Sequence, residues 1–210
     1  MLEQMRAKAV IFDVDGVLID AADWHFEAFN RALAPFGHPL TIDEHRSEYL
    51  GLTSAQKLLR LVQQGQIASE DTAAILEAKR SCTTEIIRQR CRPHSDRTRM
   101  LEVLIKRRLR LAAVSNAGRS TVTEMLDLAG LSQYLDVIVA GDDVAHPKPD
   151  AEPYARCVSL LGLLPDECLA VEDGRYGAES ALAAGIRVWR VSGPWDVNLD
   201  TLWRQVLAEV

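Results

Sequence analysis

The chain has 210 residues, of which 48% are hydrophobic and 26% charged, the composition of a folded globular protein with one or two domains. Its formal net charge of −6 argues against a broad electrostatic attraction to nucleic acid or to anionic membranes. An anionic ligand would therefore have to be bound locally, by a few placed cations or by a metal ion.

The start of the chain and its cysteines favour a cytoplasmic protein. The first apolar run, residues 9–12, ends at Asp13 and is far too short for a signal-peptide core or a membrane span. The four cysteines are scattered and form no close pair of a metal-binding or redox type, so we expect reduced thiols. We expect neither a membrane nor nucleic acid as partner, and the sequence does not indicate an oligomeric state.

Five short apolar runs predict buried strands, at residues 8–12, 109–114, 137–140, 169–171 and 187–191. Helical stretches separate the later runs. Ser120 is expected to cap a helix that Gly130 ends, and Asp150 to cap a helix that Gly162 ends. Strands that alternate with helices predict an α/β fold, with a doubly wound, Rossmann-like parallel sheet and right-handed crossovers.

Residues 21–90 contain no convincing strand and interrupt this alternation. Helical spacing recurs in them, and Ser54 is expected to open one of the helices. An all-helical block inserted after the first strand of an α/β domain predicts a cap domain, with a core made of residues 1–20 and 91–210. The basic stretch 88–110 is expected to be a solvated helix face with a linker, because no aromatic residues interleave its cations.

Asp13 and Asp15 follow the first predicted strand, separated by one residue, and Gly16 comes next. Carboxylates two residues apart on extended backbone can point into the same space, and the carboxyl ends of parallel strands face the crevice where ligands bind. Such carboxylates repel each other unless a cation intervenes, and Mg²⁺ suits phosphate chemistry. Gly16 would let the backbone approach a bound anion closely. The alternative is an ordinary surface turn.

Three further groups follow later strands. Ser115 and Asn116 suit phosphate oxygens, although such residues are often simply helix caps. Lys148 lies between two prolines that stiffen its loop and aim its ammonium group, unless it is an exposed loop lysine. Glu172 and Asp173 could complete a metal site, and the Gly- and Ala-rich helix after them is expected to pack closely on the sheet. Together these are the groups needed for phosphoryl transfer through an aspartyl-phosphate.

In this order and spacing the residues resemble the haloacid dehalogenase superfamily, in particular its subfamily I, which has a helical cap after the first motif and includes β-phosphoglucomutase and phosphoglycolate phosphatases. The resemblance covers nearly the whole chain. It implies that Asp13 is the nucleophile and a Mg²⁺ ligand, and that Asp15 is the general acid and base and binds the metal through its carbonyl. It implies that Ser115, Asn116 and Lys148 bind the phosphate group. It also implies that Asp173 and Glu172 bind the metal ion.

The chain departs from the family pattern at Gly174, where relatives commonly carry serine, and at residues 93–96, where many have Pro-Gly-Val. Neither departure removes an essential group. The rival function is that of a β-phosphoglucomutase, because His25 matches a histidine of that enzyme. However, Ser54 stands where the mutase has an arginine for the distal phosphate, and Ala21 replaces a hinge threonine. We therefore expect a phosphoric monoester hydrolase, with the mutase as the alternative and a non-catalytic phosphate-binding protein as a remote one.

The resemblance implies a small phosphorylated metabolite as substrate, such as a sugar phosphate, phosphogluconate or phosphoglycolate. Six side chains of the helical block are expected to face it, namely Trp24, His25, Arg46, Thr53, Lys57 and Lys79. We also predict a cis peptide bond between Lys148 and Pro149. A trans bond would tend to carry the chain straight on, whereas a cis bond lets the lysine turn inward.

Overall fold

The structure is a computed structural model that describes residues 7–49 and 52–207, without the side chains of Arg46 and Leu207. The chain divides into two compact units. The core unit comprises Met1–Asp20 and Arg92–Val210, and the helical unit comprises Ala21–Cys91. Their roles as catalytic core and cap stay a prediction from the sequence.

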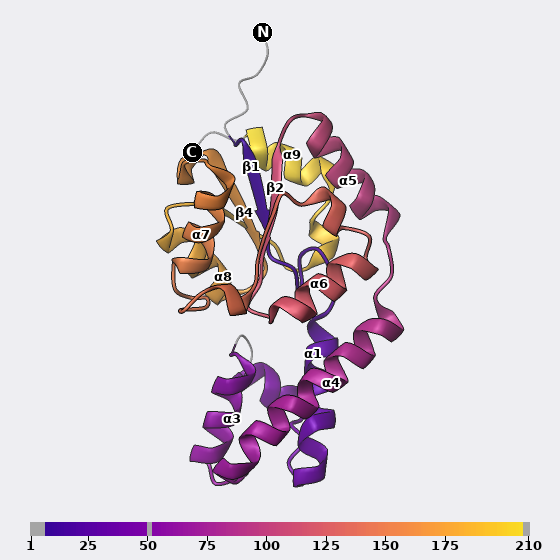
Figure 1. The fold of residues 1–210 in the computed structure, drawn as a ribbon, viewed down its shortest axis with the longest axis vertical. Helices are drawn as coiled ribbons and strands as arrows, with labels where there is room; N and C mark the ends of the chain where they lie inside the picture. The colour runs from indigo at the N-terminus through magenta and orange to yellow at the C-terminus, as the bar shows by residue number, and fades with distance from the viewer. Residues whose placement is uncertain (1–6, 50–51, 208–210) are drawn as a thin grey trace. The chain divides into compact units, whose positions relative to one another are not determined.

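The core unit is built on a five-stranded parallel sheet with the strand order β3-β2-β1-β4-β5 (Figure 1). The central strand, β1, pairs with β2 on one side and with β4 on the other, and its four residues are fully buried. A strand covered on both faces needs an unbroken apolar run, which is the pattern the sequence presents. The predicted parallel sheet is confirmed. The strands are β1 (Ala9–Phe12), β2 (Arg110–Val114), β3 (Val137–Val139), β4 (Cys168–Glu172) and β5 (Arg187–Arg190).

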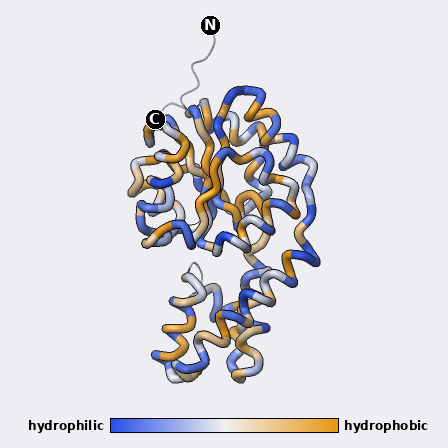
Figure 2. The backbone as a smooth tube through the Cα atoms, in the orientation of Figure 1, coloured by the Kyte–Doolittle hydropathy of each residue, from blue (hydrophilic) through white to orange (hydrophobic). Residues whose placement is uncertain are grey.

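Helices cover both faces of this sheet. In Figure 1, α7 and α8 lie on one side of the sheet, and α5 and α6 lie on the other. Figure 2 shows hydrophobic strands enclosed by helices of mixed hydropathy. The α-helices described in the core unit are α5 (Ser95–Lys106), α6 (Arg119–Leu128), α7 (Glu152–Leu161), α8 (Arg175–Ala183) and α9 (Leu199–Leu207). Short 3₁₀ segments lie at Ser132–Tyr134, Gly141–Asp143, Pro165–Glu167 and Pro194–Asp196.

The basic stretch 88–110 includes the helix α5. This helix buries Met100, Leu101 and Leu104 in the core unit, while most of the cations of the stretch are exposed. The expectation of a solvated helix face is confirmed.

The start of α6 differs from the prediction. The helix begins at Arg119, so Ser120 lies inside it, and its predicted role as the cap is wrong. The amide of Arg119 instead donates to Oδ2 of Asp142 at 2.9 Å, a carboxylate supplied by a distant loop. At the start of α7 the cap position is Ala151, so the predicted cap Asp150 lies one residue too early. Its Oδ1 still accepts from the amide of Glu152, the first residue of the helix, at 2.9 Å.

The helical unit contains no strand among its described residues, which confirms the all-helical insertion. Its core gathers apolar side chains of three helices, including Phe29, Leu61 and Ile75. The cap of α3 is Thr53 rather than the predicted Ser54, because Oγ1 of Thr53 accepts from the amide of Gln56 at 3.2 Å. The elements are α1 (Ala22–Leu33), a 3₁₀ turn (Ala34–Phe36), α2 (Ile42–Glu44), a π-helical turn (His45–Tyr49), α3 (Ser54–Gln63), a 3₁₀ turn (Ser69–Asp71) and α4 (Thr72–Arg90). Across the described parts of both units, no helix is long and apolar enough to cross a membrane.

Candidate active site

Three carboxylates meet at the carboxyl end of the sheet. Asp13 follows β1, while Glu172 and Asp173 stand at the end of the neighbouring strand β4. The amide of Asp13 donates to the carbonyl of Val171 at 3.0 Å, which continues the pairing of the two strands to the point where the acids begin. One carboxylate oxygen from each acid lies within 4.8 Å of the other two. We call Asp13, Glu172 and Asp173 the acid cluster.

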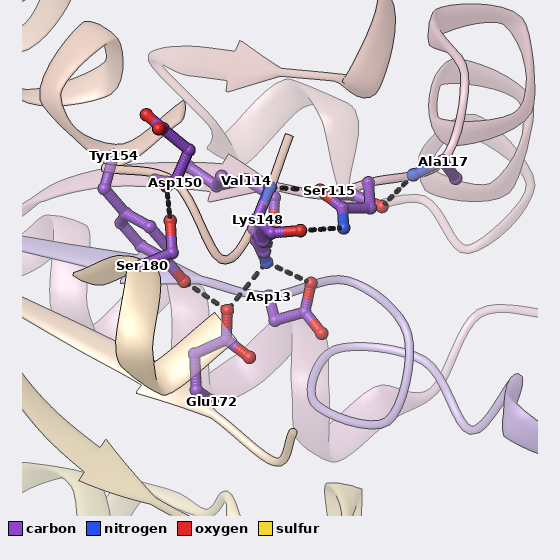
Figure 3. Close-up of polar contacts among 10 residues, drawn as sticks. Asp13, Val114, Ser115, Ala117, Lys148, Asp150, Tyr154, Glu172 and Ser180 are labelled. Atoms are coloured by element: carbon purple, nitrogen blue, oxygen red, sulfur yellow. Dashed lines mark hydrogen bonds and ion pairs between the residues drawn. The ribbon is translucent and has the colours of Figure 1, made fainter. Parts of the chain in front are cut away.

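Lys148 brings a single positive charge into the acid cluster. Its Nζ donates to Oδ1 of Asp13 at 2.9 Å and to Oε1 of Glu172 at 2.6 Å (Figure 3). A third hydrogen bond, of 2.8 Å, goes to the carbonyl of Val114 at the end of β2. The Lys148 side chain is only 5% exposed, so the alternative of an exposed loop lysine is excluded. These contacts fix the ammonium group among the ends of three strands, β1, β2 and β4.

The loop around Lys148 is itself held by side chains. Oδ1 of Asn116 accepts from the amide of Lys148 at 2.9 Å, and Nδ2 of Asn116 donates to the carbonyl of Lys148 at 3.1 Å. The hydroxyl of Ser180, on α8, donates to the carbonyl of Asp150. The peptide bond between Lys148 and Pro149 is cis, which confirms the prediction. The side chain of Asn116 is thus occupied in orienting the loop, and its role in phosphate binding stays a prediction.

Burial and mutual repulsion perturb the acids. Burial raises the pKa of Asp13, and the charge of Lys148 opposes this rise. Burial, with the negative charge of Asp13, raises the pKa of Glu172 to about 7 and that of Asp173 to about 6. Burial alone would lower the pKa of Lys148, but the carboxylates of Asp13 and Glu172 outweigh it and raise that pKa. One lysine therefore does not neutralise the three acids, and a further cation would stabilise their ionised forms.

The acid cluster fits a Mg²⁺ ion. All of its donors are carboxylate oxygens, the ligand type that Mg²⁺ prefers, and they converge at one edge of the sheet. Burial, and then the negative charge of Asp13, raises the pKa of Glu172 and that of Asp173, and a divalent ion would favour the ionised form of both. The haloacid dehalogenase resemblance implied this ion, and these residues are able to bind it.

Two glycines make room for the acids. Gly16 has a φ of +82°, and a Cβ atom there would overlap the carboxylate of Asp173. A Cβ at Gly177 in α8 would overlap the carboxylate of Glu172. The sequence predicted only close packing for the helix that contains Gly177. The available signal was a glycine in the first turn of the helix that follows the paired acids.

The two other groups predicted for the chemistry lie at the same strand ends. Asp15 is partly buried, two residues after Asp13, where the backbone turns back and the amide of Gly16 donates to the carbonyl of Ile19 at 2.8 Å. Ser115 is 3% exposed and follows β2 directly. Its Oγ accepts from the amide of Ala117 at 3.0 Å, so its hydroxyl hydrogen can still be donated to an oxyanion.

Sequence reasoning missed Tyr154. This residue lies on α7 and is completely buried, and its hydroxyl donates to Oε1 of Glu172. Nζ of Lys148 lies 5.3 Å from the centroid of its ring. The sequence placed Tyr154 on the apolar stripe of a helix. The available signal was the hydroxyl itself, because a buried tyrosine oxygen needs a partner.

Two of the six predicted substrate residues, Lys57 and Lys79, are cations that interact within the helical unit, and a third, His25, lies beside Lys79. Nζ of Lys79 lies 3.3 Å from Nδ1 of His25. Burial, followed by the charge of Lys79, lowers the pKa of Lys57 to about 8. We call Lys57 and Lys79 the cap cation cluster. Trp24 is partly buried on α1, and Thr53 is the cap of α3, while the side chain of Arg46 lies outside the described residues.

Residues 10–191 match the family of haloacid dehalogenase-like hydrolases. The chain belongs to this family. A phosphorylated carbohydrates phosphatase of Thermotoga maritima is 31% identical over 182 residues, which cover 85% of this chain and 82% of the relative. A phosphoglycolate phosphatase (plasmid) of Cupriavidus necator is 32% identical over an alignment of 212 positions, which covers 92% of this chain and 87% of the relative.

A solved structure has the same fold. CbbY from Rhodobacter sphaeroides in complex with xylulose-1,5-bisphosphate is 25% identical and superimposes with a TM-score of 0.78, covering 88% of this chain and 85% of that chain. The predicted superfamily and fold class are therefore confirmed. The expected enzyme class, a phosphoric monoester hydrolase, is confirmed by the family together with the two phosphatase relatives.

Proposed function

We propose that the chain is a Mg²⁺-dependent phosphatase that hydrolyses a small phosphorylated metabolite through an aspartyl-phosphate on Asp13. The observation that carries this proposal is the convergence of Asp13, Lys148 and the other two members of the acid cluster at neighbouring strand ends. A buried carboxylate beside one lysine and two further acids has an evident use as a nucleophile toward phosphorus. As a structural element it would be costly, because burying charge opposes folding.

In the first half of the reaction, a carboxylate oxygen of Asp13 attacks phosphorus, and the bond between phosphorus and the ester oxygen breaks. Asp15 donates a proton to that oxygen, so the alcohol leaves neutral. In the second half, Asp15 takes a proton from a water molecule, which attacks the phosphorus of the aspartyl-phosphate. Inorganic phosphate leaves, and the carboxylate of Asp13 is restored.

Charge neutralisation is the other requirement. Lys148 already contacts Asp13 and would meet the transferred phosphoryl group beside it, together with the hydroxyl of Ser115. The carboxylates of Asp13, Glu172 and Asp173, with the carbonyl of Asp15, would hold Mg²⁺. When bound, this ion supplies positive charge against which an anionic carboxylate can approach an anionic phosphate.

The substrate is proposed to be a sugar phosphate, phosphogluconate or phosphoglycolate. The names of the relatives support this class, since one acts on phosphorylated carbohydrates and another on phosphoglycolate, and the related CbbY was solved with a sugar bisphosphate. The cap cation cluster suits a second anionic group on the substrate. We retain Trp24, His25, Arg46 and Thr53 as further candidates. A cytoplasmic location is proposed from the sequence.

The proposal is tested by incubating the purified chain with a panel of small phosphate esters, with and without Mg²⁺, and measuring released phosphate. We expect release that depends on Mg²⁺ and favours esters with a second anionic or polyhydroxy group. Acid quenching of a single turnover with ³²P-labelled substrate should trap label on the protein. Interconversion of glucose phosphates without phosphate release would instead show the mutase. No turnover of any ester would overturn the proposal and favour a phosphate-binding protein.

A further inference from the structure

The carboxylate of Glu172 is held from inside the core unit by two donors that share one of its oxygens. Nζ of Lys148 and the hydroxyl of Tyr154 both donate to Oε1 (Figure 3). Tyr154 is completely buried on α7, whereas Glu172 ends β4, so the bond joins a helix to a strand end of the same core unit. The Glu172 side chain is 1% exposed. Its position is therefore fixed by these two partners and by the close approach of Gly177.

The two donors affect a metal ion differently. Lys148 is positively charged, so its ammonium group repels a divalent cation at the same time as it orients the carboxylate. The Tyr154 side chain is a completely buried phenol, a donor without a formal charge. It can therefore hold Glu172 without opposing the cation. The final torsion of a glutamate side chain is soft, so a hydrogen bond to one oxygen largely decides where the other oxygen points.

We propose that Tyr154 is a positioning residue for the metal site: its hydroxyl holds Oε1 of Glu172 and so directs Oε2 toward Mg²⁺. This inference rests on the proposed function, which assigns Mg²⁺ to the acid cluster. Partners that orient a metal ligand commonly change metal affinity by about 10- to 100-fold when they are removed. A tyrosine that only satisfied its own buried hydroxyl would instead affect folding stability and leave metal affinity unchanged.

The test substitutes Tyr154→Phe, which keeps the buried ring and removes only the hydroxyl. Mg²⁺ binding to the metal-free protein is measured by isothermal titration calorimetry, and phosphate release is measured across Mg²⁺ concentrations. We expect the Kd for Mg²⁺ to rise by about 10-fold. We also expect kcat to recover at saturating Mg²⁺, because Tyr154 does not touch the reacting atoms.

The chain offers a matched control in Tyr134→Phe. The hydroxyl of Tyr134 also donates to a glutamate, Oε1 of Glu102, at 3.1 Å in the same unit, but neither residue belongs to the acid cluster. This variant should bind Mg²⁺ as the wild type does. A Kd for Mg²⁺ in Tyr154→Phe within twofold of the wild-type value would overturn the inference, whatever its effect on thermal stability.

A second measurement uses the wild-type sequence with labelled tyrosines. With the four tyrosines replaced by 3-fluorotyrosine, the ¹⁹F signal of Tyr154 should shift when Mg²⁺ is added, and that of Tyr134 should not. An unmoved Tyr154 signal in a protein that binds Mg²⁺ would also overturn the inference. A wild-type protein that neither binds Mg²⁺ nor releases phosphate would overturn the proposed function. If the wild-type protein binds Mg²⁺ and releases phosphate, and Tyr154→Phe has the same Kd for Mg²⁺, only the role of Tyr154 is overturned.

Discussion

The carboxylate of Glu172 lies against Gly177 so closely that a Cβ atom at position 177 would overlap it. Gly177 is inside α8, where alanine is ordinarily more favourable than glycine by up to ~1 kcal/mol. Its presence there is explained by the acid and not by the helix. The missing side chain allows a charged group to occupy the space between a strand end and the helix that follows it.

We therefore predict that Gly177→Ala displaces Glu172 and weakens Mg²⁺-dependent phosphate release. Overpacking of this kind should lower the free energy of unfolding by about 1–3 kcal/mol, despite the better helix propensity. The matched control is Gly174→Ala, since Gly174 has an ordinary φ of −86° and a Cβ there would meet no other described residue within 4 Å. Urea unfolding and phosphate release measure both variants. Wild-type stability and Mg²⁺ response in Gly177→Ala would contradict the packing argument.

Asp13→Asn should abolish turnover while the protein stays folded. The amide cannot attack phosphorus, so the rate of phosphate release should fall by more than about 100-fold. The fold should survive because an asparagine oxygen can still accept the hydrogen bond from Lys148. Asp20→Asn, an exposed change on the same segment, serves as the control. Circular dichroism checks folding, and a folded variant with more than a hundredth of wild-type activity would refute the role of the nucleophile.

The sequence predicted the sheet and the strand-end acids for a clear physical reason. Buried parallel strands must be continuous apolar runs, so β1, β2 and β4 were visible, and the polar residues that end them had to meet at one edge. The neighbouring prolines likewise marked the loop of Lys148. All of these signals are local in the chain.

The contacts that the sequence did not predict join residues from separate elements. Tyr154 and Glu172 are 18 positions apart, and the pattern of α7 shows only that the ring is buried. At the start of α6, the amide of Arg119 donates to the carboxylate of Asp142, which is 23 positions away, and the predicted cap Ser120 is not used. Which polar group completes a helix end or a buried hydroxyl depends on how the elements pack, and spacing along one element does not contain that information.

Chelation should remove activity, and Mg²⁺ should restore it. The acid cluster contains three carboxylates against one lysine, so it needs a further cation to stay ionised when buried. We also expect Mg²⁺ to raise the thermal midpoint of the metal-free protein, because a ligand that binds only the folded state stabilises it. EDTA already saturated with Mg²⁺ is the control for effects of the chelator itself. Full activity in excess free EDTA would exclude the metal from the reaction.

Lys57 gives a pH-dependent prediction in the helical unit. Burial, and then the charge of Lys79, lowers its pKa from 10.5 to about 8. The unfolded chain keeps the ordinary value, so between about pH 8 and 10.5 the unfolded state binds more protons than the folded state. The free energy of unfolding should therefore rise with pH across this interval as far as Lys57 contributes. Below about pH 8 the lysine is charged in both states, and its burial then destabilises the folded protein in full.

Replacing this lysine by an uncharged side chain of similar length should remove the penalty. Lys57→Met is expected to raise the free energy of unfolding at pH 7 by about 1 kcal/mol, less than the pKa shift alone would give, because the group is partly solvated. The gain over the wild type should shrink as the pH approaches 10, since the wild-type lysine is then neutral in the folded state. Lys106→Met, at an exposed position, controls for the loss of a charge. Urea unfolding at pH 7 and pH 9.5 measures the three proteins. If Lys57→Met does not raise the free energy of unfolding at pH 7, or raises it equally at pH 9.5, then burial does not lower the pKa of this lysine. Either result would weaken the assignment of Lys57 to a cluster that binds an anion.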